Sequence, residues 1–314
     1  MVLRRAPRRG GLRVVLVALA FMLAGCGGKA NAPGGGASAS AGRFPLTLID
    51  DEGVRVTLKA APQRIVTFAP ADTEIVYALG VGNRLVGVSY HAFDNYPPQA
   101  ASLPEIGGAN TAPNLERVES LQPDLMLATA GGQDWKQRLR DLGIPVFTTN
   151  ASSFDDALRD IRTIGRVTGA DQQAARLTLQ MAASAGALRA KLAAVPPVTC
   201  FLDLGGLYTV APQDFVYDLL VRAGCDPVTA GARSSYPQWS KDQLVQEDPA
   251  VFLFTSDSGD SIAQLRGDAA LRTIAAIRDG KVFSVDSDLI SRPGPRLVDG
   301  VMALVRVLHP GVAG

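Results

Sequence analysis

The chain has 314 residues, enough for two domains of ordinary size or for one large domain. It is 47% hydrophobic and 19% charged, as expected of a globular protein. Residues 1–25 contain five arginines and no acid, so subtracting these five from the net charge of +1 leaves about −4 for the rest. A mildly acidic body lacks the basic surface that nucleic-acid binding requires, so we expect no nucleic-acid partner.

An export signal is predicted for residues 1–25. The arginine-rich start precedes the apolar run VVLVALAFML at 14–23, which is too short to span a bilayer stably. The following LAGC resembles the lipobox of bacterial lipoproteins, which implies that Cys26 is lipidated. We therefore expect an extracytoplasmic protein that is lipid-anchored to the cell membrane, in the periplasm or on the outer face of the cytoplasmic membrane.

The segments that follow the signal are predicted to be a tether and a hairpin. Residues 26–42 are rich in glycine, serine and alanine, a composition typical of flexible tethers. Residues 43–61 contain two alternating apolar runs around the turn sequence DDEG at 50–53, which predicts a β-hairpin.

Strands and helices alternate through residues 62–152. The runs RIVTFAP, RLVGVS, DLMLAT and IPVFTT predict strands, and ADTEIVYALG, NLERVESLQ and WKQRLRDLG predict helices. Asn114 is the expected N-cap of the second helix, and Pro123 ends it. Alternation of this kind predicts parallel βαβ units rather than a β-sandwich.

Residues 153–195 have a helical pattern only. Apolar side chains recur every three or four residues from Ala174 to Leu192, and Pro196 ends the pattern. In residues 196–314 the alternation resumes with VTCFLDLG, DFVYDLLVRAG, DQLVQED, AVFLFT, ALRTIAAIRDG and KVFSVD, and a final helix starts within GPRLVDGVMALVRVLH. The predicted fold class is α/β, with two lobes built on mostly parallel sheets on either side of this long helical segment.

An internal repeat supports two related lobes. NLERVESLQPDLMLAT at 114–129 recurs as SKDQLVQEDPAVFLFT at 240–255, with a constant offset of 126 residues. Asn114 then corresponds to Ser240, and Glu116 to Asp242. Each copy is predicted to be a capped helix, a proline and a buried strand.

Enzyme chemistry has no support in the sequence. There are two histidines, His91 and His309, and no phosphate loop, zinc-protease motif or nucleophile elbow. We expect no catalysis, no cofactor and no metal site. Cys200 and Cys225 either form a disulfide or are small buried residues, because two cysteines alone do not define a framework.

Aromatic and charged residues gather in loops that follow predicted strands. In α/β sheets these carboxyl-end loops are where ligands bind, and aromatic faces suit a large planar ligand. We therefore predict a ligand cleft between the lobes. Its candidate residues are Tyr90, His91, Phe93 and Tyr96 from the first lobe and Tyr208, Tyr236, Trp239, Asp288, Arg292 and Arg296 from the second.

From Arg64 to His309 the chain resembles the solute-binding proteins of bacterial ABC importers for cobalamin and iron chelates. The resemblance rests on the ordered motifs RIVTFAPADTEIVYALG, LVGVS, YPP, NLERVESLQPDLMLAT and YPQWSKDQLV, and it is greatest to the cobalamin-binding members. It implies two lobes bridged by a long rigid helix, with the ligand cleft between them. It also implies a monomer that captures a small-molecule chelate and docks on an ABC permease dimer with its ATPase subunits. In those members two acids dock on permease arginines, and Glu116 and Asp242 occupy the matching positions.

The ligand residues match the family pattern less completely. The cleft tyrosine falls within YHAFDNY, where Tyr90, His91 and Phe93 are all candidates, and Tyr236 replaces a tryptophan. The family's SDW segment matches Ser287 to Leu289, with leucine in place of the aromatic residue. Cobalamin or a related corrinoid is the first expectation. The alternatives are a ferric siderophore bound by Arg292 and Arg296, or haem with a tyrosine or His91 as axial ligand.

Overall fold

The computed structural model describes residues 44–107 and 112–312. The predicted signal segment, Cys26 and the tether at 26–42 lie outside the described residues. Within the described ranges, no helix combines the length and the apolar composition needed to cross a membrane.

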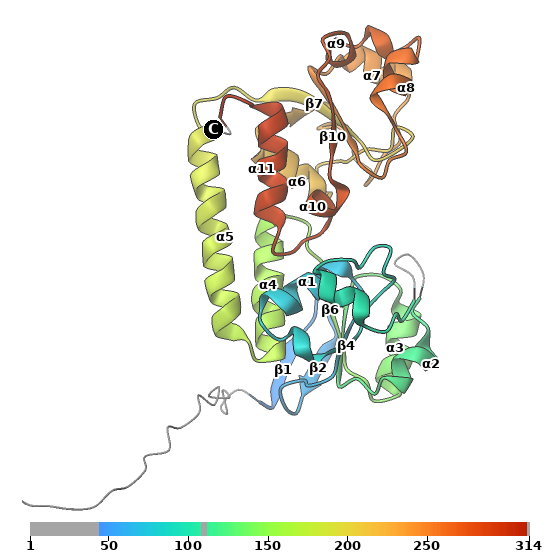
Figure 1. The fold of residues 1–314 in the computed structure, drawn as a ribbon, viewed down its shortest axis with the longest axis vertical. Helices are drawn as coiled ribbons and strands as arrows, with labels where there is room; N and C mark the ends of the chain where they lie inside the picture. Colours follow the sequence, from blue (N-terminus) through green and yellow to red (C-terminus); the bar gives the residue numbers. More distant parts are fainter. Residues whose placement is uncertain (1–43, 108–111, 313–314) are drawn as a thin grey trace, which may run out of the picture. The chain divides into compact units, whose positions relative to one another are not determined.

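Two four-stranded parallel sheets form the centres of the two lobes (Figure 1). The N-terminal sheet contains β3 (Ile65–Thr67), β4 (Leu85–Gly87), β5 (Leu125–Thr129) and β6 (Val146–Thr149), in the order β4-β3-β5-β6. The C-terminal sheet contains β7 (Val198–Asp203), β8 (Cys225–Pro227), β9 (Val251–Thr255) and β10 (Val282–Val285), in the order β10-β9-β7-β8. If strands are numbered within each lobe, both sheets have the order 2-1-3-4. The predicted α/β class with two related lobes is confirmed.

Helices cover these sheets. The N-terminal lobe has α1 (Pro70–Ala78), α2 (Leu115–Ser120) and α3 (Gln133–Asp141), with short 3-10 turns η1 (Gly82–Arg84) and η2 (Pro98–Ser102). The C-terminal lobe has α6 (Phe215–Arg222), α7 (Lys241–Glu247), α8 (Ile262–Gly267), η3 (Leu271–Thr273), α9 (Ala275–Arg278), α10 (Ser287–Ser291) and α11 (Leu297–Leu308). The strands between them are mostly buried, as parallel strands covered on both faces should be.

The single helix predicted for ALRTIAAIRDG is wrong. The segment is broken at Ile274, whose backbone is extended (φ −69°, ψ 137°) between η3 and α9. The side chain of Asp248, from the loop before β9, accepts a hydrogen bond of 2.6 Å from the backbone N–H of Ala275 at the start of α9. This contact with a residue distant in sequence replaces the continuous helix that local periodicity favours.

The internal repeat corresponds to equivalent structural units. The strands β5 and β9 are offset by 126 residues, and the N-cap side chains Asn114 and Ser240 each accept a hydrogen bond from the third helical N–H. Gln122 and Asp248, also 126 apart, both have a left-handed backbone just before a proline. The repeat therefore extends to the helix cap, the left-handed turn and the strand.

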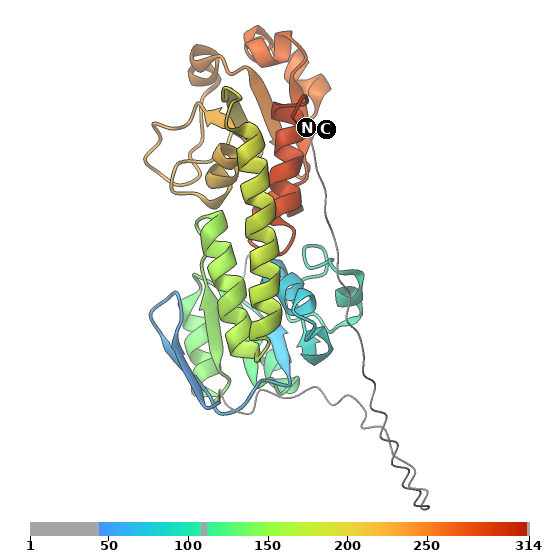
Figure 2. The same ribbon diagram turned by 90° about the vertical axis from the view of Figure 1, so that its left-hand side faces the viewer.

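The bridging segment consists of two helices, rather than the one long helix predicted. α4 (Phe154–Thr168) ends at Gly169, whose left-handed φ of 75° stops it, and α5 (Asp171–Leu192) follows. Figures 1 and 2 show the two helices side by side. Ala174 of α5 packs so closely on Gly165 of α4 that a β-carbon at Gly165 would lie 2.3 Å from that of Ala174. The close helix pair makes the bridge stiffer than a linker.

One apolar core extends through both lobes and the bridge. Ile65 of β3, Ile164 of α4 and Leu202 of β7 belong to the same buried cluster. Separate clusters cover the other face of each sheet, around Met126 in the N-terminal lobe and Phe252 in the C-terminal lobe. Burial of apolar surface shared by the lobes opposes their separation.

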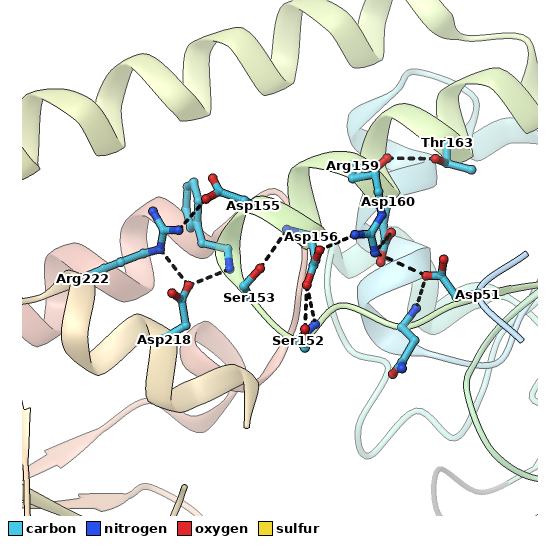
Figure 3. A network of polar contacts seen from close by, with 12 residues as sticks. Asp51, Ser152, Ser153, Asp155, Asp156, Arg159, Asp160, Thr163, Asp218 and Arg222 are labelled. Atoms are coloured by element: carbon cyan, nitrogen blue, oxygen red, sulfur yellow. Dashed lines mark hydrogen bonds and ion pairs between the residues drawn. The ribbon is translucent and has the colours of Figure 1, made fainter. Parts of the chain in front are cut away.

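Polar contacts also join the bridge to the C-terminal lobe at the start of α4 (Figure 3). Asp218 of α6 accepts hydrogen bonds from the backbone N–H of Phe154 (2.8 Å) and from the Arg222 guanidinium (2.7 Å). Arg222 in turn pairs with Asp155 at 2.7 Å. The two ends of this contact lie in α4 and α6, so it fixes the bridge to the C-terminal lobe.

The predicted hairpin is present as β1 (Leu46–Ile49) and β2 (Arg55–Leu58), paired antiparallel. Its turn carries three consecutive acids, each with a separate partner in the lobe. Asp50 accepts from the N–H of Thr148, Asp51 from that of Asn150, and Glu52 pairs with Lys136 at 2.8 Å. The turn therefore attaches the hairpin to the ends of the N-terminal sheet.

Candidate functional site

The loop from Tyr90 to Tyr96 follows β4 at the carboxyl end of the N-terminal sheet. Asp94 holds it from inside, because its buried carboxylate accepts hydrogen bonds from Thr73 Oγ1 (2.8 Å) and Ser89 Oγ (3.1 Å). Burial raises the pKa of Asp94. The rings of Tyr90, Phe93 and Tyr96 are 46%, 47% and 42% exposed. One buried acid thus anchors a loop that presents three aromatic rings; we define residues 90–96 as the aromatic loop.

His91 is engaged within its own lobe. Its Nε2 lies 2.9 Å from the carbonyl oxygen of Leu103, and its Nδ1 lies 3.1 Å from the Glu105 carboxylate. The backbone N–H of His91 donates to the same carboxylate at 2.8 Å. Both ring nitrogens therefore have protein partners, and an axial metal ligand would have to break one of these contacts.

Two loops of the C-terminal lobe present Tyr208 and Tyr236, which are both 49% exposed. The loops are joined by backbone hydrogen bonds from Thr209 N–H to the Pro237 carbonyl (2.9 Å) and from Trp239 N–H to the Leu207 carbonyl (3.0 Å). They follow β7 and β8, again at the carboxyl end of the sheet. Both tyrosines are held in place by backbone pairing between the loops.

Asp214 fixes the backbone of Tyr236. Its buried carboxylate accepts hydrogen bonds from the N–H groups of Ala211 (2.7 Å) and Tyr236 (2.9 Å). Tyr236 has a left-handed φ of 47°, which a non-glycine residue adopts only when its surroundings impose it. Partial burial and the nearby Asp214 raise the pKa of the Tyr236 phenol.

Trp239 differs from the other predicted aromatic residues because it is partly buried. Its ring packs on Phe201 of β7 with the ring centroids 5.7 Å apart. It belongs to the rim of an apolar cluster of the C-terminal lobe. Its role as a ligand contact stays a prediction.

The residues Asp288, Arg292 and Arg296 follow β10, and the two arginines reach the N-terminal lobe. Arg292 and Arg296 both pair with Glu74 of α1, at 3.0 Å and 2.6 Å, and Asp288 pairs with Arg292 at 2.6 Å. Their sequence positions suggested ligand contacts, which stay a prediction, but their observed partners are protein groups. Glu74 was missed by the sequence reading. The sequence feature that could have identified Glu74 is an acidic residue among the apolar and β-branched residues of α1.

The carboxyl ends of both sheets thus meet at one lobe–lobe contact. α1 starts at the carboxyl end of β3, and the segment 286–296 follows the carboxyl end of β10, so the ion pairs of Glu74 connect these two edges. The five exposed aromatic rings described above lie on loops at the same two edges. These five are also all of the aromatic side chains with high exposure in residues 44–107 and 112–312.

The two acids predicted to dock on a permease are both exposed. Glu116 and Asp242 each occupy the second position of a short helix, α2 and α7, whose N-cap is a side chain with a direct hydrogen bond. A negative charge in the first turn is also favourable to the helix dipole. Equivalent acids therefore stand at equivalent places on the two lobes.

A cavity of about 290 Å³ lies under the hairpin, lined by Glu52, Val54, Asp134, Gln137 and Arg140. It contains none of the predicted ligand residues, so it lies apart from the candidate site. In the described part of the chain, no three His, Cys, Asp or Glu side chains are grouped in a way that could hold a metal ion.

A family model described as periplasmic binding protein matches residues 65–289. The chain belongs to the periplasmic binding protein family. It is 31% identical to YvrC of Bacillus subtilis, an uncharacterised ABC transporter substrate-binding lipoprotein, over 96% of this chain and 98% of that one. It is 33% identical to a cobalamin-binding protein of Halobacterium salinarum, over 85% and 74% of the two chains. The crystal structure of the periplasmic vitamin B12 binding protein BtuF of Vibrio cholerae matches with a TM-score of 0.70 at 25% identity, covering 79% of this chain and 97% of that one.

Family membership establishes the general role of this periplasmic binding protein. It is the extracytoplasmic substrate-binding component of an ABC importer. Its partners are a permease and the associated ATPase, and its ligand is a small molecule. These comparisons confirm the family resemblance that the sequence motifs indicated.

Proposed function

We propose that this periplasmic binding protein captures cobalamin or a related corrinoid and hands it to the permease, without a cofactor of its own and without covalent chemistry. The main support for this proposal is that five exposed aromatic residues gather at the carboxyl edges of the two sheets. The charged side chains predicted there as ligand contacts are already in ion pairs. A corrinoid is a large ring with amide side chains. A site with aromatic faces and few free charges suits such a ligand.

The same contacts make the two alternative ligands less favourable. An anionic ferric siderophore would need Arg292 or Arg296, and both guanidiniums are already ion-paired, Arg296 with Glu74 and Arg292 with Glu74 and Asp288. Haem would need an axial ligand, but both ring nitrogens of His91 are engaged. A tyrosinate at Tyr236 is opposed by the raised pKa of that phenol. The names of the Halobacterium and Vibrio relatives point in the same direction as these contacts.

Calorimetric titration of residues 43–314 with cyanocobalamin, a ferric hydroxamate and haemin tests this proposal. We expect a saturable heat with cyanocobalamin at micromolar or lower concentrations and weaker or no binding of the other two. The variant Tyr208→Ala should weaken cobalamin binding on the order of tenfold, because stacking contacts with one aromatic ring are worth about 0.5–1.5 kcal/mol. Binding of haemin or the hydroxamate in preference to cyanocobalamin would overturn the corrinoid assignment.

We further propose that the protein is a monomer held at the membrane by a lipid on Cys26, with Glu116 and Asp242 as its contacts with the permease. The equivalent placement of the two acids suits a permease that has its own twofold symmetry. The anchor is tested by cell fractionation. Cys26→Ala should release the protein from the membrane fraction, and retention of the variant there would contradict the anchor.

A further inference from the structure

Glu74 is a buried acid that binds two arginines of the other lobe. Its Oε1 accepts from Arg292 Nη1 at 3.0 Å, and Arg296 donates from Nε to Oε2 at 2.8 Å and from Nη2 to Oε1 at 2.6 Å. The side chains are 2% exposed for Glu74, 9% for Arg292 and 20% for Arg296. The two-pronged contact of Arg296 with this carboxylate is strongly directional, and Arg292 adds a single hydrogen bond, so Glu74 positions both guanidiniums.

Each of these arginines also contacts the aromatic loop. Arg292 donates from Nη2 to the carbonyl oxygen of Phe93, and the Arg296 guanidinium lies 4.1 Å from the centre of the Tyr96 ring. Glu74 itself makes none of these contacts, but it holds the two groups that do. The loop that carries the exposed rings is therefore fixed from two sides: by Asp94 within its own lobe and by the arginines from the other lobe.

We propose that Glu74 is a positioning residue for ligand binding: through Arg292 and Arg296 it holds the aromatic loop in the conformation that receives the ligand. This inference rests on the proposed function. It also makes the geometry of the loop depend on the relative position of the lobes, because the acid lies in the N-terminal lobe and the arginines lie in the C-terminal lobe.

A contact between the bridge and the C-terminal lobe provides the comparison. Asp218 of α6 accepts hydrogen bonds from the Phe154 N–H at the start of α4 and from Arg222 of its own helix (Figure 3). The variants Glu74→Gln and Asp218→Asn therefore each remove one carboxylate charge from a contact between separate parts of the fold. Only the partners of Glu74 also contact the aromatic loop.

Hydrogen exchange measured by mass spectrometry reports directly on the order of the aromatic loop. The N–H groups of Phe93 and Asp94 both donate to the Tyr90 carbonyl, so their exchange reports the order of the loop. In the purified protein, Glu74→Gln should accelerate exchange at these two amides by about tenfold, whereas Asp218→Asn should accelerate it at Phe154 and leave the aromatic loop unchanged. Equal acceleration in α5 and in the loop after Glu74→Gln would indicate general destabilisation and overturn the proposal.

Ligand binding gives the second readout. Glu74→Gln should weaken the affinity for cyanocobalamin by about tenfold, and Asp218→Asn should leave it within about twofold of the parent protein, because groups that share no partners usually act independently. If Glu74→Gln does not fold, Arg296→Lys serves instead. It keeps the charge but loses the planar face on Tyr96, and it should loosen the loop and weaken binding in the same direction.

The two proposals fail separately in this experiment. If the parent protein does not bind cyanocobalamin but Glu74→Gln still loosens the aromatic loop selectively, the corrinoid assignment is wrong and the positioning of the loop stands. If the parent binds cyanocobalamin and Glu74→Gln changes neither exchange nor affinity, the positioning role is wrong and the corrinoid assignment stands.

Discussion

Asp72 in the first turn of α1 is 2% exposed, and its Oδ2 has no hydrogen-bond partner among the described residues. Burial raises the pKa of this carboxyl to about 8, and the nearby Asp160 and Asp94 act in the same direction. The unfolded chain releases this proton near 3.8. Between these two pH values the folded state binds more protons than the unfolded state, so stability falls as the pH rises through this window.

The variant Asp72→Asn should remove this dependence. Well below pH 3.8 it should be no more stable than the parent, because there the parent carboxyl is neutral in both states. The difference should then grow in favour of the variant by up to about 1.4 kcal/mol for each pH unit towards pH 8. Urea unfolding of both proteins across this range measures it. Stability curves that remain parallel from acid to neutral pH would contradict the prediction.

The hairpin is an element held by charge as much as by apolar contact. Lys136 of α3 is fully buried and pairs with Glu52, whose side chain is 7% exposed. Burial alone would raise the pKa of Glu52, but the hydrogen bonds from Lys136 and from the Gly131 N–H lower it. The hairpin turn is therefore stabilised only while both charges are present.

Replacing Lys136 by Met should destabilise the protein by about 3–5 kcal/mol, because it leaves the Glu52 carboxylate buried without its cation. Denaturant unfolding gives the loss. Arg138→Met, on the exposed face of the same helix, is the control and should change the free energy of unfolding by no more than about 0.5 kcal/mol. Similar losses in the two variants would mean that the ion pair has no special role.

The pair β7–β8 is joined covalently by a disulfide between Cys200 and Cys225, which resolves the alternative that the sequence left open. The bridge closes a loop with a sequence separation of 25 residues. Reduction should lower the free energy of unfolding by about 3 kcal/mol through the greater entropy of the unfolded chain. Urea unfolding with and without a thiol reductant measures this, and a Cys200→Ala and Cys225→Ala variant should not respond to the reductant. The prediction would be contradicted if the reductant did not change the free energy of unfolding of the parent protein.

At the scale of the whole molecule, two lobes of the same strand order carry one exposed acid each at equivalent positions. Changing both Glu116 and Asp242 to Lys should abolish uptake of labelled cobalamin by cells and leave the affinity of the purified protein unchanged, because neither acid lies on the ligand loops. The same reversal at Glu119 and Glu247, exposed on the same two helices, is the control and should preserve uptake. A loss of ligand affinity in the first pair would show that these helices do not form the docking face.

Local signals predicted most of the elements. The caps at Asn114 and Ser240 and the left-handed Gly169 act within a few residues of the helix ends that they set, although the stop at Gly169 was missed within a long helical pattern. The exposed aromatic candidates were also selected from sequence, because they follow strands whose carboxyl ends share an edge, and their role in ligand binding stays a prediction. The break at Ile274 was missed because its cause, the Asp248 cap of α9, comes from another segment.

The sequence by itself determined the two related α/β lobes, the family and the exposed aromatic candidates, because periodicity, caps and motif order are local properties of the chain. Only the tertiary structure decided which charged side chains are free to contact a ligand. Glu74 and Arg292 are 218 positions apart, and nothing near either residue marks the other as its partner. Packing of the lobes turns them from two separate charges into a buried ion pair, and burial also holds a proton on Asp72. Burial depends on how the lobes pack, so no single segment encodes it.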